Sequence, residues 1–243
     1  HPRSIMAVTF TNKAAGEMRE RINKLVGQAV PVSTGWRGLT IGTFHSICAR
    51  ILRADAPAAG LNPNFVIYDD GEQLTAVKQA LRDLKLDEKL YKPEAMRSAI
   101  SKAKNELIRP QQFEATTYWA EIARRVYARY EEILTANGGL DFDDLLCRVA
   151  WLFREQPEVL KRYQDRYEYL LVDEFQDTNT AQYEMVYRLA SASRNVFCVG
   201  DEDQSIFMFR GADYRNVMRF REDFPEAKVV LLEQNYRSTQ TIL

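Results

Sequence analysis

Cysteine is scarce in this chain. The 243 residues contain three cysteines, Cys48, Cys147 and Cys198, which lie far apart and form no CxxC pair. Zinc sites and disulfide frameworks need cysteines at closer or paired spacing. The spacing therefore argues against both kinds of site, and it favours three core thiols in a reducing compartment.

Long apolar runs are also absent. No segment approaches the roughly 18 consecutive apolar residues of a membrane-spanning helix, and the first residues lack the charged and apolar regions of a secretory leader. We therefore expect a cytoplasmic protein without a membrane partner. The chain begins with His1 rather than Met, and an apparent strand follows within a few residues. We expect it to start inside a larger protein.

Neither sign of charge is in excess, since the formal net charge is -1. A basic field over the whole surface is excluded, so any binding of nucleic acid must come from a local surface. The hydrophobic content of 46% is ordinary for a globular protein that forms a sizeable core. The length fits one large domain or two small ones.

The loop that cradles nucleotide phosphates in many nucleoside triphosphatases is missing. No segment matches its pattern, G-x-x-x-x-G-K-[ST]. The chain on its own therefore lacks the main phosphate cradle of that class of enzyme.

Short apolar segments, each separated from the next by a helical pattern, are the main structural signal that is present. They cover residues 5–10, 39–41, 169–172 and 196–199. Strands of this kind, alternating with helices, predict an α/β fold with a parallel sheet that is covered on both faces. The helix after the first strand has apolar residues spaced for one buried face, namely Ala14, Ala15, Met18, Ile22 and Leu25.

The strand pattern disappears between about Asp69 and Asp165, where helical spacing replaces it. The apolar positions with this spacing are Val77, Leu81 and Leu84 in one segment and Val126, Tyr130, Ile133 and Leu134 in another. Prolines and a glycine pair, at Pro93, Gly138, Gly139 and Pro157, divide the region into separate helices. We expect a helical insertion.

Two adjacent carboxylates, Asp173 and Glu174, end the apolar strand in the segment LLVDEFQDTN. A parallel strand delivers residues at its C-terminal end into the ligand crevice of the sheet. In a nucleoside triphosphatase the first acid would hold Mg²⁺ through its waters, and the second would orient or deprotonate the attacking water. The alternative is a surface acidic turn that caps the next helix. The following Phe175, Gln176 and Asp177 favour the nucleotide site.

A second strand leads into the segment VGDEDQSIFMFRGAD, residues 199–213. Gln204 lies where an amide could sense a terminal phosphate. Phe207, Phe209 and Arg210 place two aromatic rings and a guanidinium together, and stacking on such a platform contributes about 1–3 kcal/mol per base. The alternative is that the alternating aromatic rings face the core.

These segments resemble the UvrD/PcrA/Rep family of superfamily 1A DNA helicases nearly from end to end. Six of the family's motifs occur in its order: IMAVTFTNKAAGEMRERI resembles motif Ia, IGTFHSICARILR motif Ib, LDFDDLL the segment before motif II, LLVDEFQD the DExx box, GDEDQSIFMFRGAD motif III and LEQNYRS motif IV. The resemblance implies a RecA-like sheet with a helical insertion. It assigns residues 1–68 to the first part of motor domain 1A, 69–165 to the insertion 1B, 166–231 to the second part of 1A, and 232–243 to the start of motor domain 2A.

The resemblance implies ATP and Mg²⁺ as cofactors. Asp173 and Glu174 would then serve Mg²⁺ and the hydrolytic water, and Gln204 would touch the γ-phosphate and couple it to DNA. Tyr236 would stack on adenine, and Arg237 would reach the γ-phosphate in the manner of an arginine finger. For Tyr236 and Arg237 the alternative is an ordinary helix start.

The resemblance also implies a track for single-stranded DNA. Its residues would be Phe10, Asn12, Lys13, Thr43, His45, Phe207, Phe209 and Arg210. His45 could instead be a helix-start or core residue, and Lys13 a solvated lysine. Many relatives have Tyr and Trp where Phe207 and Phe209 stand here, so the rings keep their π-faces without the polar groups.

The function implied by the resemblance belongs to a larger protein, an ATP-dependent 3′ to 5′ helicase in DNA repair, replication or recombination. Its partners would be single-stranded DNA, single/double-strand junctions, and repair or replication proteins. Lys102, Lys104 and Arg109 could contact duplex DNA, although charged helix faces are usually just solvated. Alternatives are a catalytically silent DNA-binding or interaction module and the helicase arm of a nuclease fusion. The family's phosphate loop precedes motif Ia, so we expect this chain to be inactive alone.

Overall fold

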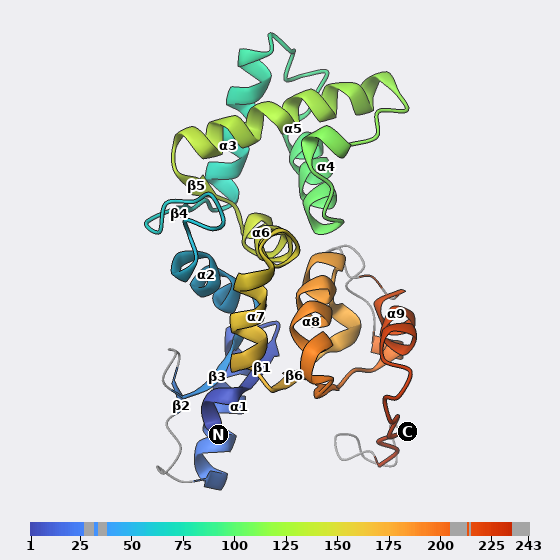
Figure 1. Cartoon of the computed structure of the whole chain (residues 1–243). Helices are drawn as coiled ribbons and strands as arrows, with labels where there is room; N and C mark the ends of the chain where they lie inside the picture. Colours follow the sequence, from blue (N-terminus) through green and yellow to red (C-terminus); the bar gives the residue numbers. More distant parts are fainter. Residues whose placement is uncertain (27–31, 34–37, 205–212, 214, 235–243) are drawn as a thin grey trace.

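The structure is a computed structural model that describes residues 1–26, 32–33, 38–204, 213 and 215–234. A body built around a β-sheet carries a helical arm, formed by the helices labelled α3, α4 and α5 (Figure 1). Among the described residues no helix is long and apolar enough to cross a membrane.

The central sheet has five strands in the order β2-β3-β1-β6-β7, and every neighbouring pair is parallel. The strands are β1 (Ile5–Thr9), β2 (Val32–Ser33), β3 (Leu39–Thr43), β6 (Tyr169–Val172) and β7 (Val196–Cys198). Val8 pairs with Gly42 on one side and with Val172 on the other, so the C-terminal ends of three strands lie at one edge. The predicted α/β fold with a parallel sheet is confirmed.

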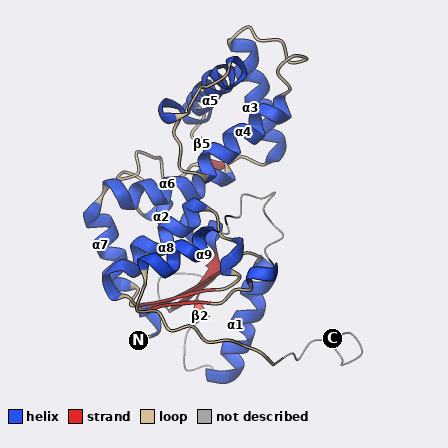
Figure 2. Ribbon diagram, turned by 90° about the vertical axis from the view of Figure 1, so that its right-hand side faces the viewer, coloured by secondary structure: helices blue, strands red, loops and turns tan. Residues whose placement is uncertain are grey.

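Helices cover the two faces of this sheet unequally (Figure 2). The body contains α1 (Asn12–Val26), α2 (Phe44–Ala54), α6 (Phe142–Glu155), α7 (Pro157–Arg166), α8 (Thr180–Ser193) and α9 (Arg215–Asp223), with short 3₁₀ turns at Pro2–Ser4, Phe175–Asp177 and Glu202–Gln204. Met6, Val8, Leu170 and Val172 share one core with α2, α6 and α8. This large apolar core holds the strand ends in place.

The opposite face is covered only in part by the described residues. Ala15 of α1 packs with Ala7 of β1 and with Ile41 of β3. On the same face, Leu171 of β6 is 37% exposed and Phe197 of β7 is 61% exposed. Among the described residues the expected cover of both faces is therefore found only for the β1–β3 half, because α1 reaches the side chains of β1 and β3 and not those of β6 and β7.

The predicted apolar face of α1 is also shorter than expected. Ala15 is buried, and Met18 and Ile22 pack against it. Leu25 is 84% exposed, which contradicts its place on the buried face. The packed cluster ends at Ile22, so the last turn of the helix has no described apolar surface to meet.

The helical arm has an apolar core of its own. It consists of α3 (Asp70–Asp83), α4 (Pro93–Asn105) and α5 (Tyr118–Ala136), with a 3₁₀ turn at Pro110–Gln112. The predicted apolar positions Val77, Leu81, Val126, Tyr130 and Leu134 are all buried there. A capping box of Asp69 and Glu72 starts α3, and Pro93 occupies the first turn of α4. The predicted division between helices at Pro93 is confirmed.

A small parallel ladder joins the arm to the body. β4 (Val66–Ile67) pairs with β5 (Gly139–Leu140). Two-residue strands carry no detectable period, so the sequence did not reveal them. Helices α6 and α7 pack with α2 and α8 of the body. The domain boundaries at residues 69 and 165 stay a prediction.

Candidate functional site

The predicted site residues of four segments meet at the C-terminal edge of the sheet. Thr9 at the end of β1 pairs with Thr43 at the end of β3, and Val172 at the end of β6 pairs with Cys198 in β7. Ligands of open parallel sheets bind in the crevice at this edge. The segments that follow these four strands therefore form the candidate site.

Asp173 and Glu174 follow directly after β6. The Asp173 N–H donates to the Val8 carbonyl at 3.0 Å, and the Thr9 hydroxyl donates to Asp173 Oδ2 at 3.3 Å. The backbone of Glu174 is left-handed, with φ 53° and ψ 44°. For a residue other than glycine this conformation costs about 1–3 kcal/mol, and it persists only where the surroundings impose it.

Phe175 supplies part of that constraint. Its N–H donates to the Val199 carbonyl at 2.9 Å, and its side chain is 4% exposed in the main core. The residue after Glu174 is therefore anchored to the residue that follows β7, while the Glu174 side chain is exposed at the sheet edge. Strain of this kind is typical of functional sites.

Gln176 is a site residue that the sequence reasoning missed. Its side chain is 3% exposed. Its amide donates to Glu174 Oε2 at 2.8 Å, and its oxygen accepts from the Asp201 N–H at 3.1 Å. A Cβ added to Gly200 would lie 2.8 Å from that oxygen, so glycine permits the close approach. The signal was its place in DEFQD, which we used only to favour the acid pair.

Gln204 lies in the same loop as Asp201, which Gln176 joins to Glu174. It ends the 3₁₀ turn Glu202–Gln204, and its amide donates to Asp201 Oδ2 at 2.6 Å. The loop of Gln204 is thereby connected to Glu174 through Asp201 and Gln176. The structure thus brings the predicted acids and Gln204 to neighbouring strand ends.

Within the described part of the chain, Asp173 and Glu174 receive hydrogen bonds from neutral groups, the Thr9 hydroxyl and the Gln176 amide. Burial and the charge of Glu174 raise the pKa of Asp177, whose buried Oδ1 has no hydrogen-bond partner among the described residues.

No group of three or more potential metal ligands occurs in the ranges that the structure describes. Two carboxylates are a poor site for a metal bound by protein alone. They fit Mg²⁺, which usually keeps several waters and takes further ligands from substrate phosphates. Asp173 and Glu174 are therefore suitable for Mg²⁺ that arrives with a nucleotide.

Aromatic residues lie near the ends of β1 and β3. Phe10, directly after β1, is partly exposed, and its ring makes a T-shaped contact with the ring of Phe44, with centroids 5.4 Å apart. Asn12 and Lys13 are exposed in the first turn of α1. The free N–H groups of a helix start attract anions, and the lysine adds positive charge. This arrangement suits a base beside Phe10 and a phosphate near Lys13.

Thr43 and His45 lie at the start of α2. Thr43 is 7% exposed and caps the helix by accepting from the Ser46 N–H at 3.2 Å. Its side chain therefore has a local structural role, and its contact with DNA stays a prediction. Burial lowers the pKa of His45, against the opposing charge of Asp143. A neutral imidazole is suited to stacking rather than to pairing with phosphate.

Phe142 is a second candidate that the sequence reasoning missed. It is the first residue of α6, it is 47% exposed, and its ring lies edge-on to His45 at 5.8 Å. Both rings line an open groove of about 730 Å³ together with Asp69, Asp70 and Gly71. The available signal was an aromatic residue among the acids of the segment LDFDDLL.

Comparison with known proteins identifies the family. Residues 1–225 match the UvrD/REP helicase N-terminal domain. The chain belongs to this family. Three relatives named ATP-dependent DNA helicase PcrA match the whole chain: that of Staphylococcus aureus strain Mu50 is 48% identical, that of Bacillus subtilis strain 168 is 47% identical and that of Staphylococcus epidermidis is 46% identical.

The chain covers 33%, 32% and 33% of these three relatives, so it spans about a third of their length. Several residues that the UvrD/REP resemblance assigns to the site lie outside the described residues. They are Phe207, Phe209, Arg210, Tyr236 and Arg237. Their roles stay predictions.

Both interpretations of Lys104 from the sequence, as a DNA-facing lysine and as a solvated lysine, are wrong. Lys104 is 0% exposed and pairs with buried carboxylates, so it cannot contact duplex DNA from the surface. Arg109 pairs with Glu155 and lies over the Trp151 ring. Lys102 is exposed, as expected for a solvated or DNA-facing lysine.

Proposed function

We propose that this chain is part of an ATP-dependent DNA helicase motor, in which it supplies the acids of the ATP site and part of a track for single-stranded DNA. The observation that carries the proposal is the strained Glu174 beside Asp173, joined through Gln176 to the loop of Gln204. Movement from 3′ to 5′, and roles in repair, replication or recombination, rest on the family resemblance.

In the ATP site, Asp173 would hold Mg²⁺ through water, and Glu174 would orient or deprotonate the attacking water. The metal would supply charge neutralisation at the phosphates. Gln204 would meet the γ-phosphate, Tyr236 the adenine, and Arg237 the γ-phosphate from the second motor domain. The bridge through Gln176 gives Glu174 a fixed direction relative to the Gln204 loop.

The motor needs a phosphate loop that these 243 residues lack. Support for a further element comes from β7, whose Phe197 is 61% exposed beside Leu171, and from the apolar residues 229–232, whose exposure is 67–84%. Apolar surface of this kind is usually covered by a partner. We infer that the covering element carries the phosphate loop, and that the chain alone does not hydrolyse ATP.

On the DNA side, single-stranded DNA would run along the C-terminal sheet edge. Bases would stack near Phe10 and near the pair of His45 and Phe142, while Lys13 would meet a phosphate. The acidic Asp69 and Asp70 in the groove disfavour phosphate there. Bases rather than backbone would therefore face the groove. The proposed partners are single-stranded DNA and its junctions with duplex.

The test is fluorescence anisotropy of a labelled oligo(dT) titrated with the 243-residue chain at low and moderate salt. Circular dichroism first establishes that the chain is folded. Binding that weakens with salt would support a DNA track in this chain, because phosphate contacts release counterions. Absence of binding by the folded chain would overturn the claim that it carries a DNA site by itself.

A catalytically silent DNA-binding module is the second candidate, favoured by the missing phosphate loop. The two candidates differ in a protein that joins this chain to the phosphate loop and second motor domain of a relative. The motor proposal expects DNA-stimulated ATP hydrolysis that Glu174→Gln reduces about 10²–10⁴-fold. Equal turnover by the variant would remove Glu174 from the role of general base.

A further inference from the structure

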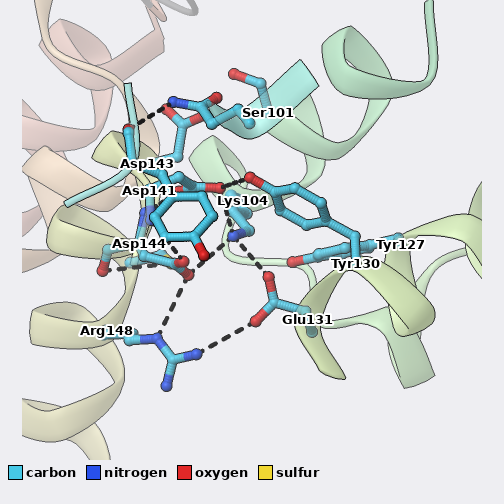
Figure 3. A network of polar contacts seen from close by, with 12 residues as sticks. Ser101, Lys104, Tyr127, Tyr130, Glu131, Asp141, Asp143, Asp144 and Arg148 are labelled. Atoms are coloured by element: carbon cyan, nitrogen blue, oxygen red, sulfur yellow. Dashed lines mark hydrogen bonds and ion pairs between the residues drawn. The ribbon is translucent and has the colours of Figure 1, made fainter. Parts of the chain in front are cut away.

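A fully buried lysine lies where the helical arm meets the body. Lys104, near the end of α4, is 0% exposed. Its Nζ lies 2.6 Å from Glu131, 2.8 Å from Asp141 and 2.9 Å from Asp144 (Figure 3). A buried charge is tolerated when it is paired and hydrogen-bonded. The three acids come from α5 and from the start of α6, so the lysine joins the arm to the body.

Lys104 binds both members of the capping box that starts α6. Asp141 Oδ1 accepts from the Asp144 N–H at 2.7 Å, and Asp144 Oδ2 accepts from the Asp141 N–H at 3.1 Å. The lysine contacts the other oxygen of each residue, Asp141 Oδ2 and Asp144 Oδ1. The Tyr130 hydroxyl also donates to Asp141 Oδ2, at 2.8 Å. The cap and the ion pairs therefore reinforce each other.

Asn105, the residue after Lys104 in α4, also bonds to the start of α6. The Asn105 amide donates to Asp143 Oδ1 at 2.9 Å. Its oxygen accepts from the side chain of Asn179, which is the N-cap of α8 after the acid pair. Lys104 and Asn105 thus hold residues on both sides of Phe142 and reach the helix that follows Asp173 and Glu174.

Phe142 is the aromatic residue of the turn 141–144, and its ring lies at the surface. It is 47% exposed and lies edge-on to His45 at 5.8 Å. Phe142 thus lies between residues that side chains of α4 hold, although α3, α4 and α5 contribute no ring to the contact with His45.

We propose that Lys104, with Asn105 beside it, is a positioning residue that holds Phe142 against His45 and thereby sets the affinity for single-stranded DNA. This inference rests on the proposed function. A purely structural Lys104 would change the stability of the chain and leave the affinity of the folded protein unchanged. Coupling between Lys104 and Phe142 in DNA binding separates the two roles.

The experiment is a double-mutant cycle on the 243-residue chain with labelled oligo(dT), using Lys104→Met, Phe142→Ala and the double variant. Loss of one base stack lowers affinity about 5–150-fold. In the wild-type background, Lys104→Met is expected to lower the affinity for oligo(dT) within that range. In the Phe142→Ala background, the same substitution is expected to cause no further loss of affinity. Lys102→Met, which removes an exposed lysine of the same helix, should not show this coupling to Phe142. Fully additive losses would overturn the proposal.

Removal of Lys104 leaves Asp141 without its cation and leaves Glu131 and Asp144 with Arg148 alone, so the variant can fail to fold. Asn105→Ala then takes its place, because it keeps the ion pairs and releases Asp143 and Asn179. Thermal unfolding establishes that each variant is folded at the assay temperature. If the wild-type chain does not bind oligo(dT), the proposed function fails. If it binds, and both variants bind equally well, this inference alone fails.

Discussion

Gln176 donates a hydrogen bond to the Glu174 carboxylate at 2.8 Å while its oxygen accepts from the Asp201 N–H at 3.1 Å. The amide therefore links the end of β6 to the loop after β7. Both donors and acceptors of a buried amide need partners, and this geometry satisfies one of each. The exposed carboxylate of Glu174 owes its direction in part to this buried side chain.

Gln176→Leu should lower the free energy of unfolding by about 1–3 kcal/mol, because the Asp201 N–H and the Glu174 carboxylate both lose a partner. Urea unfolding of the chain measures this difference. Gln79→Leu is the matched control, since Gln79 is exposed on α3 and its loss should stay within about 0.5 kcal/mol. Equal effects of the two substitutions would contradict a special role for Gln176.

Glu174→Gly should be more stable than Glu174→Ala by about 1 kcal/mol or more, because only glycine adopts φ 53° without strain. Both variants lose the carboxylate and its hydrogen bond, so their difference isolates the backbone. Chemical denaturation of the two proteins gives the value. An Ala variant as stable as the Gly variant would mean that the left-handed backbone stores no strain.

Much of the fold was predictable because its signals are local. The apolar run Tyr169–Val172 followed by acids gave both β6 and the candidate site. Leu25 was misjudged because helical periodicity does not reveal where the neighbouring sheet ends. The exposure of Phe197 was not predicted for a related reason, because the apolar pattern of a strand does not indicate which helix covers each of its faces.

The missed site residues depend on contacts that are distant in sequence. Lys104 was expected on the surface, because no feature of the neighbouring sequence indicates that the distant residues Asp141 and Asp144 pair with it in the interior. Gln176 and Phe142 stood in recognised motifs, yet their roles emerge only from Asp201 and His45. Polar networks across elements are the part of a site that spacing alone does not give.

Gly200→Ala should destabilise the chain by about 1–3 kcal/mol, because its Cβ would lie 2.8 Å from Gln176 Oε1 and 3.3 Å from the Gln176 backbone nitrogen. The end of the Gln176 side chain would have to move away to make room, so the hydrogen bond from the Asp201 N–H to Gln176 would break. Gly16→Ala is the control. A Cβ there meets nothing within 4 Å inside α1, and alanine should add up to about 1 kcal/mol of stability. Thermal melts that move in the same direction would contradict this reasoning.

Asp141 should make the stability of the chain depend on pH near neutrality. Burial and the charge of Asp144 raise the pKa of Asp141 from 3.8 to about 7, although Lys104 opposes the shift. The other groups that face it are Asp143, Glu131 and the Tyr130 hydroxyl. Between about pH 4 and 7 the native state then binds more protons at this carboxyl than the unfolded state does. Its contribution to stability is full below about pH 4 and is lost as pH rises through about 7.

Asp141→Asn isolates this contribution, because an amide keeps a capping oxygen and does not titrate. The lowered pKa of His45 acts in the opposite direction, because its contribution to stability is lost as pH falls. Wild type and variant share this contribution, so it cancels in the difference between their stabilities. The stability of the wild type minus that of the variant should fall between about pH 4 and 7, at most by about 1.4 kcal/mol per pH unit. Urea unfolding across this range measures it. A difference that stays flat would mean that Asp141 is ionised throughout and that Lys104 outweighs its burial.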